Sequence, residues 1–91
     1  MIKVRFEDGK MEAEGHALMA PAGSDIVCSA FSMLVFTLIN GLGNDMSDMD
    51  LDNGSCRITW KENKTTHIVA KTIKGGIQLL ANKYPENVKM F

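Results

Sequence analysis

One stretch of sequence decides the fold, namely Ser24-Asp25-Ile26-Val27-Cys28-Ser29-Ala30-Phe31-Ser32-Met33-Leu34-Val35-Phe36-Thr37-Leu38-Ile39. Its apolar residues recur at intervals of three and four, which predicts an amphipathic helix with a wide apolar stripe. Ser24 is a suitable N-cap, and Asp25 stands in the first turn, where the helix dipole favours a carboxylate. Gly41 or Gly43 is expected to end the helix. Because the stretch is apolar on nearly every side, we expect this helix to be the most buried element.

A β-hairpin is predicted before this helix. Apolar and charged residues alternate over residues 2–7, as is typical of a strand with one face in water. Asp8-Gly9 suits a two-residue type I′ turn, in which both central residues have positive φ. Residues 11–14 alternate again in the returning strand, and residues 17–24, which contain Pro and Gly, are expected to form a loop.

A second hairpin is predicted after the helix. Residues 48–52 alternate three aspartates with apolar residues, which indicates a short strand with a solvated face. They do not match a calcium loop, which needs Gly and Glu at fixed later positions. Asn53-Gly54 is the strongest hairpin signal in the chain, and the apolar side chains within residues 56–60 share one face of the strand that follows.

A second helix is predicted to begin near Thr65 and to stop before Pro85. Gly75-Gly76 lies inside it and is expected to permit close helix packing. Residues 87–91 are expected to form a last short strand. The apolar face of this helix contains Val69, Ile73, Ile77, Leu80 and Tyr84.

The order of elements is therefore β-β-α-β-β-α-β. Hairpins that flank helices predict an α+β fold, with an antiparallel β-sheet and two helices packed on it. At 91 residues, we expect a single domain spanning residues 1–91.

The composition limits the classes of function. Ten basic and eleven acidic residues leave a formal net charge of −1, which gives no electrostatic case for binding nucleic acid. The sequence contains no run of about 18 apolar residues, which a membrane span would need. The N-terminus lacks the apolar region of a secretory signal. We therefore expect a cytoplasmic protein whose two cysteines stay reduced. Most of the seven methionines are expected to fill gaps in the core.

Cys28 and His16 are the residues best suited to catalysis. Cys28 lies in the first full turn of the predicted helix, where unpaired backbone N–H groups favour a negatively charged sulfur. His16 ends a strand, so the loop after it can fold back and bring the imidazole to the sulfur. A Cys–His pair is the minimum for thiolate catalysis, and the helix-start N–H groups are placed to hold an oxyanion. Spacing alone is a weak signal, because buried cysteines that only pack are common.

Two stretches resemble the signature of the ribosomal-processing cysteine protease family (Prp). They are Gly15-His16-Ala17 and, after the loop, Asp25-Ile26-Val27-Cys28-Ser29-Ala30-Phe31-Ser32. Asn40-Gly41-Leu42, residues 84–89 and the order of elements extend the resemblance over most of the chain. The resemblance implies a bacterial, cytoplasmic, homodimeric thiol protease that uses no metal or cofactor. Such an enzyme removes the N-terminal extension of a large-subunit ribosomal protein by cutting after an aromatic residue.

The resemblance also implies roles for individual residues. His16 is the catalytic histidine and Cys28 the nucleophile. Gly15, Asp25 and Ser32 are supporting residues: Gly15 lets the backbone turn beside His16, Ser32 lies one turn after Cys28, and Asp25 holds the loop or is an ordinary first-turn acid. The loop residues expected to contact substrate are Ala17, Leu18, Met19 and Gly23.

Several alternatives remain open at the level of the sequence. The loop residues 18–22 differ from the Gly and Tyr-type residues expected in the family, so the chain is alternatively a prophage-type relative that cleaves a phage capsid or scaffold protein. A non-catalytic dimeric peptide-binding module is a further alternative. A zinc site of Cys28, Cys56, His16 and His67 is disfavoured because the ligands form no close pair. Cys56 is instead expected to pack in the core and His67 to lie at the surface.

Overall fold

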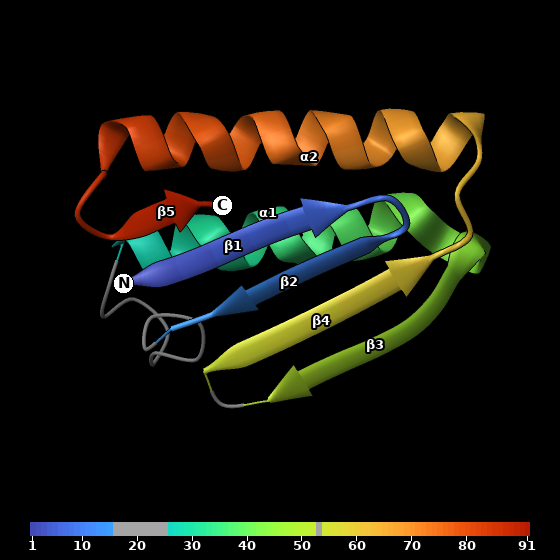
Figure 1. Cartoon of the computed structure of the whole chain (residues 1–91), viewed down its shortest axis with the longest axis horizontal. Helices are drawn as coiled ribbons and strands as arrows, with labels where there is room; N and C mark the ends of the chain where they lie inside the picture. The colour runs from blue at the N-terminus through green and yellow to red at the C-terminus, as the bar shows by residue number, and fades with distance from the viewer. Residues whose placement is uncertain (16–25, 53) are drawn as a thin grey trace.

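The computed structural model describes residues 1–15, 26–52 and 54–91. Over these ranges, five strands form one sheet in the order β3-β4-β2-β1-β5, with helices on one face (Figure 1). The α+β class and the predicted order of elements are confirmed. The elements are β1 (Ile2–Glu7), β2 (Lys10–Glu14), α1 (Ile26–Leu42), the 3₁₀ helix η2 (Gly43–Asp45), β3 (Met46–Asp52), β4 (Ser55–Trp60), α2 (Lys64–Lys83) and β5 (Val88–Met90).

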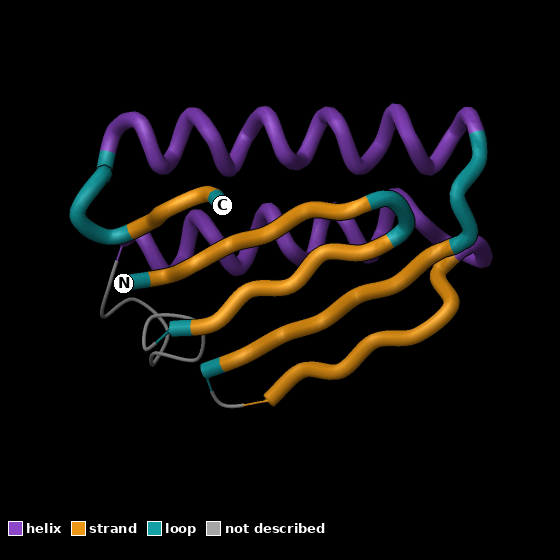
Figure 2. Tube along the Cα trace, in the orientation of Figure 1, coloured by secondary structure: helices purple, strands orange, loops and turns teal. Residues whose placement is uncertain are grey.

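The sheet is mixed, whereas the sequence predicted a wholly antiparallel one. β5 pairs in parallel with β1, in the register Ile2 with Val88 and Val4 with Met90, whereas the other strand pairs are antiparallel. The reason is the crossover through α2, which carries the chain from the end of β4 back to the opposite end of the sheet before β5 begins (Figure 2).

The first hairpin forms as predicted, but its turn is not of type I′. Gly9 has a φ of +74°, and no described residue other than glycine has a positive φ, so Asp8 does not meet the type I′ requirement. Contacts from outside the hairpin hold the turn. The backbone N–H of Gly9 donates to Oε2 of Glu62 over 2.9 Å, and its carbonyl accepts from the N–H of Trp60 over 2.9 Å.

The core lies between the sheet and the helices. Alternation in the strands directs one set of side chains towards the helices, and it leaves the intervening charged residues on the open face. Phe31 of α1 is completely buried, which contributes about 1.5–3 kcal/mol of stability. The buried sheet residues are Ile2, Val4, Met11, Ala13, Cys56, Ile58, Trp60 and Val88. Tyr84 packs half-buried against this core.

Helix α1 is not the most buried element, contrary to the prediction. Its sheet-facing stripe is buried, but Ile26, Met33 and Phe36 on its other sides are exposed by 74%, 65% and 55%. The physical reason is that α1 shares the core with the sheet and packs against α2, while Ile26, Met33 and Phe36 lie outside the core cluster. By length and composition the segment Ile26–Asp45 could cross a membrane, a test that core helices of soluble proteins also pass.

The expectation that most methionines fill the core holds for only three of the six described. Met11 is fully buried, and Met46 and Met90 pack partly buried against the core. Met1, Met33 and Met49 are exposed. Exposed thioethers leave adaptable apolar surface on the chain.

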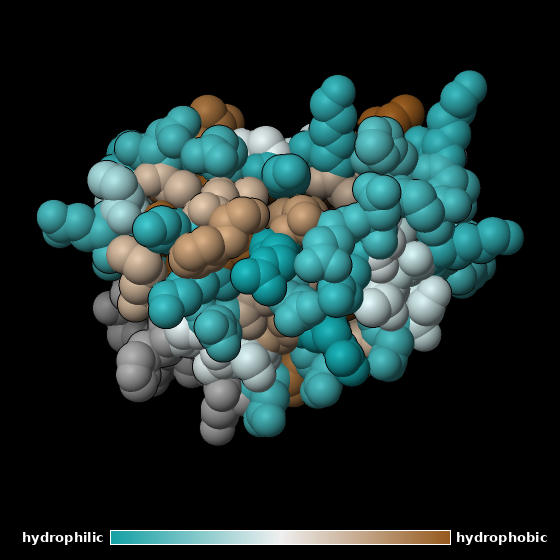
Figure 3. Space-filling view, viewed as in Figure 1, coloured by the Kyte–Doolittle hydropathy of each residue, from teal (hydrophilic) through white to brown (hydrophobic). Residues whose placement is uncertain are grey.

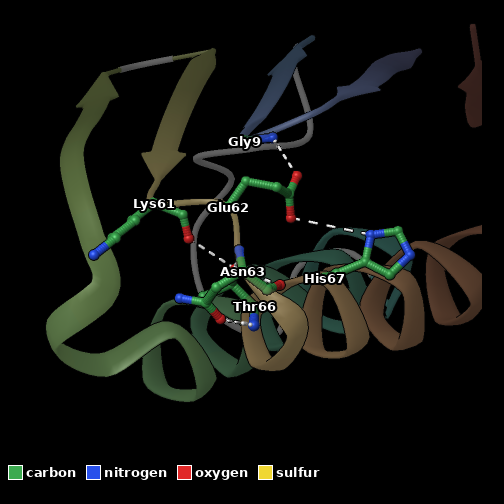
Figure 4. Close-up of polar contacts among 6 residues, drawn as sticks. All are labelled: Gly9, Lys61, Glu62, Asn63, Thr66 and His67. Atoms are coloured by element: carbon green, nitrogen blue, oxygen red, sulfur yellow. Dashed lines mark hydrogen bonds and ion pairs between the residues drawn. The ribbon is translucent and has the colours of Figure 1, made fainter.

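Helix α2 begins earlier than predicted because Asn63, not Thr65, is its N-cap. Oδ1 of Asn63 accepts from the N–H of Thr66, and Oγ1 of Thr66 accepts from the N–H of Asn63, each over 2.9 Å (Figure 4). This reciprocal capping box satisfies the helix end. The Thr66 hydroxyl also donates to the carbonyl of Lys61 over 2.8 Å, so the cap fixes the β4–α2 connection.

Glycines allow α1 and α2 to approach closely. A Cβ on Gly41 would lie 2.8 Å from Cγ1 of Val69, and one on Gly76 would lie 3.0 Å from Cδ2 of Leu34. A Cβ on Gly75 would meet nothing within 4 Å. The close packing predicted for the glycine pair therefore applies to Gly76, and it occurs between helices of the same chain.

We expect Gly75→Ala and Gly41→Ala to change stability in opposite directions. Gly75→Ala should stabilise by about 1 kcal/mol, because alanine favours a helix and the added methyl has room. Gly41→Ala should destabilise, because Val69 is β-branched and cannot move aside without shifting a helix. Thermal unfolding followed by circular dichroism measures both. A lower melting temperature for Gly75→Ala, or a higher one for Gly41→Ala, would contradict the helix packing described.

Candidate active site

Cys28 lies in the first turn of α1, as the sequence predicted. It is the third described residue of α1, and the residue is 5% exposed. The first N–H groups of a helix have no intrahelical acceptors, so this turn carries a partial positive charge. N–H groups at a helix start are donors of the kind that stabilise a developing oxyanion.

The start of α1 lies at the end of the sheet where β2 ends. In Figure 1, the beginnings of β1 and β4 and the ends of β2 and β3 also lie at this end of the long axis. The strand registers agree, because Glu14 pairs with both Lys3 and Ser55, and Ser55 pairs with Asp52. The chain therefore brings Gly15 and the first turn of α1 to the same end of the molecule.

Gly15 is required where it stands. Its φ is +146°, and a Cβ there would overlap the carbonyl oxygen of Met1 and lie 2.9 Å from Cα of Ile2. On its other side, its N–H donates to the carbonyl of Gly54 over 2.8 Å. The predicted role of a glycine that lets the backbone turn has this physical basis, and it fixes the chain directly before His16.

We expect Gly15→Ala to destabilise the fold more than a matched glycine substitution. The new side chain would meet backbone atoms and an unfavourable φ, which together cost at least about 1–3 kcal/mol. Gly43→Ala is the control, since Gly43 also has a positive φ, of +53°, but a Cβ there meets nothing within 4 Å. Urea unfolding measures both variants. An equal loss in the two would show that the contact with Met1 does not constrain residue 15.

Ser32 lies one turn after Cys28 on α1 and is half-buried. The other residues predicted for the site lie outside the described residues, namely His16, Asp25 and the substrate-loop residues Ala17, Leu18, Met19 and Gly23. The predicted N-cap Ser24 also lies outside them. The described part of the site is therefore Cys28, Ser32 and Gly15.

The second cysteine has a different environment. Cys56 lies in β4, where it pairs with Ala13 of β2, and it belongs to the hydrophobic core as predicted. Burial raises the pKa of its thiol to about 11, although a backbone hydrogen bond with Ala13 opposes this shift. At neutral pH Cys56 is therefore a protonated packing residue and a poor nucleophile.

The described residues show no group of three His, Cys, Asp or Glu side chains that could hold a metal ion. Among the ligands of the alternative zinc site, Cys56 is in the core and His67 is exposed on α2, while His16 lies outside the described residues. The nearest carboxylate oxygen described for His67 is Oε1 of Glu62, 4.0 Å from its Nδ1 (Figure 4).

An α+β fold with a cysteine in the first turn of a helix is an arrangement used by thiol-dependent enzymes. The family model "Cysteine protease Prp" matches residues 1–89, so the chain belongs to the Prp family of ribosomal processing cysteine proteases. Among curated relatives, the ribosomal processing cysteine protease Prp of Mycoplasma genitalium is 31% identical, over 97% of this chain and 92% of its own length. That of Mycoplasma pneumoniae is 50% identical over 36 residues, which cover 40% of this chain and 36% of the relative.

Solved structures share the fold. A protein from Streptococcus mutans superposes with a TM-score of 0.79 at 29% identity, covering 99% of this chain and 91% of its own. The essential ribosomal processing protease Prp from S. aureus, in complex with a covalently linked product peptide, superposes with a TM-score of 0.79 at 22% identity. That match covers 98% of this chain and 94% of the S. aureus chain.

Proposed function

We propose that this chain is a cysteine endopeptidase that removes the N-terminal extension of a large-subunit ribosomal protein, cutting after an aromatic residue. The observation that carries the proposal is the position of Cys28 in the first turn of α1, at the sheet end where Gly15 directly precedes His16. Membership of the Prp family supports the same activity. The S. aureus relative holds a covalently linked product peptide, which supports nucleophilic catalysis in this family.

The proposed reaction has two steps. His16 takes the proton from the Cys28 thiol, and the sulfur attacks the carbonyl carbon of the scissile bond. Backbone N–H groups of the first turn of α1 hold the oxyanion, and His16 gives its proton to the leaving amine. The resulting thioester is then hydrolysed by water, which releases the N-terminal fragment and restores the thiol.

The supporting roles are assigned in the same proposal. Gly15 fixes the backbone before His16, Ser32 lies one helical turn beyond the sulfur-bearing residue, and Asp25 holds the loop or the start of the helix. Substrate contacts are assigned to Ala17, Leu18, Met19 and Gly23. The protein is proposed to act in the cytoplasm as a homodimer, without metal or cofactor.

Cys28→Ala and His16→Ala should each abolish cleavage and leave the fold intact. The substrates are peptides that contain Phe, including the N-terminal extension of the ribosomal protein, and mass spectrometry reads the products. A second set from phage capsid and scaffold proteins tests the prophage alternative. Cys56→Ala is the matched control and should retain cleavage, because its thiol is protonated in the core. Cleavage by Cys28→Ala would contradict the proposal, and binding without cleavage by the unmodified protein would favour the peptide-binding module.

Iodoacetamide should modify Cys28 at least about ten times faster than Cys56 at pH 8, because the thiolate is the reacting form. With a pKa of about 11, Cys56 is only about 0.1% thiolate at that pH. Peptide mapping after timed quenching gives the two rates. Unfolding in urea is the control and should make them similar. Equal slow rates in the folded protein would count against an activated Cys28.

A further inference from the structure

The two edges of the sheet differ in what they offer to a partner. At one edge, β5 has three residues and packs against α2. At the other, β3 has seven residues, and all but the half-buried Met46 are exposed. One side of β3 pairs with β4, and no described strand pairs with its outer side, which presents backbone N–H and C=O groups along this edge. An extended peptide can add to such an edge as a further strand.

The side chains of β3 differ between the two faces of the sheet. Met49 and Leu51 pair with Ile58 and Cys56, whose side chains face the helices, and they are 42% and 40% exposed. On the other face lie the carboxylates of Asp48, Asp50 and Asp52. A strand added beside β3 would therefore meet apolar and acidic side chains in alternation.

Acidic charge is concentrated at this edge. β3 contains three aspartates and no lysine or arginine, although the whole chain has a formal net charge of only −1. On the open face the sign of the charge alternates from one strand to the next. Arg5 of β1 lies opposite Glu12 of β2, which lies opposite Arg57 of β4, which lies opposite Asp50 of β3. The open face is accordingly hydrophilic over most of the sheet (Figure 3), with a hollow of about 470 Å³ between these charged side chains.

We propose that β3 binds the substrate as an added strand, and that it selects an extended segment in which basic and apolar residues alternate. This inference rests on the proposed function. Basic residues would face Asp48 and Asp50, and apolar ones would face Met49 and Leu51. A protein that assembles with ribosomal RNA neutralises phosphates with Lys and Arg, so this class of substrate supplies the complementary charge. β3 runs towards the end of the long axis at which the described part of α1 begins, and β4 and β2 lie between β3 and β1, behind which α1 runs (Figure 1).

A second copy of this chain is the less favourable occupant of the edge. Pairing two β3 strands would place aspartates beside aspartates, and like charges across a strand pair are destabilising. The same aspartates therefore repel self-association and attract a basic peptide.

The test compares two variants that each remove two negative charges. D48N/D50N should raise KM about 3- to 10-fold at low salt for a peptide with alternating basic and apolar residues, with kcat unchanged, because exposed ion pairs are individually weak. D8N/E86Q is the control and should leave KM unchanged, since Asp8 and Glu86 are exposed outside β3. For a peptide whose basic residues are replaced by glutamine, both variants should match the parent. Equal KM values for all three proteins on the basic peptide would overturn the charge selection.

Backbone pairing is tested separately in full-length Cys28→Ala, which should bind peptide without cutting it. Hydrogen exchange should slow at amides of residues 46–52 when the basic peptide is added, and a peptide N-methylated at alternate residues should lose this effect. If the peptide binds and the exchange rates of the β3 amides do not change, β3 is not the docking surface, and the proposed peptidase activity is unaffected by this result. If D48N/D50N instead only increases self-association, the aspartates serve repulsion alone and the proposal fails.

Discussion

The packing of α1 on the sheet is the contact on which the rest of the structure depends. Val27, Phe31, Val35 and Leu38 form its buried stripe and meet the apolar face of the strands. Because this stripe begins at Val27, the described start of α1 is held at one end of the sheet. Cys28 is the next residue, so the same apolar contacts that stabilise the fold also place the thiol at the positive end of a helix.

Much of this arrangement could be predicted from the sequence, because it is encoded in local patterns. When one face of a strand or helix is buried, its apolar residues recur at regular intervals in the sequence. Residues 2–7 and α1 both show such intervals. The position of Cys28 in the first turn followed from the start of that spacing. Gly15 was identified through the family signature, and the structure supplies the reason, which is its contact with Met1 and Ile2.

What the sequence did not reveal depends on contacts between distant segments. The parallel pairing of β5 follows from the α2 crossover, and the conformation of the Asp8-Gly9 turn follows from its contacts with Glu62 and Trp60. The exposure of Met33 and Phe36 depends on how many neighbours α1 has, which its composition does not determine. The open edge at β3 was missed for the same reason. Its aspartates, without a lysine or arginine in the strand, were the signal that could have identified it.

Chemistry and recognition thus occupy different parts of a small fold. The proposed nucleophile lies at a helix end, while the proposed docking strand is an edge whose side chains remain in solvent. The measurement that tests the central claim most directly is the intact mass of the protein after rapid acid quenching during turnover of a Phe-containing peptide. We expect a population heavier by the N-terminal fragment less one water, with the adduct mapped to Cys28 as a thioester. Turnover with the adduct on another residue, or turnover by a protein that lacks the Cys28 sulfur, would contradict it.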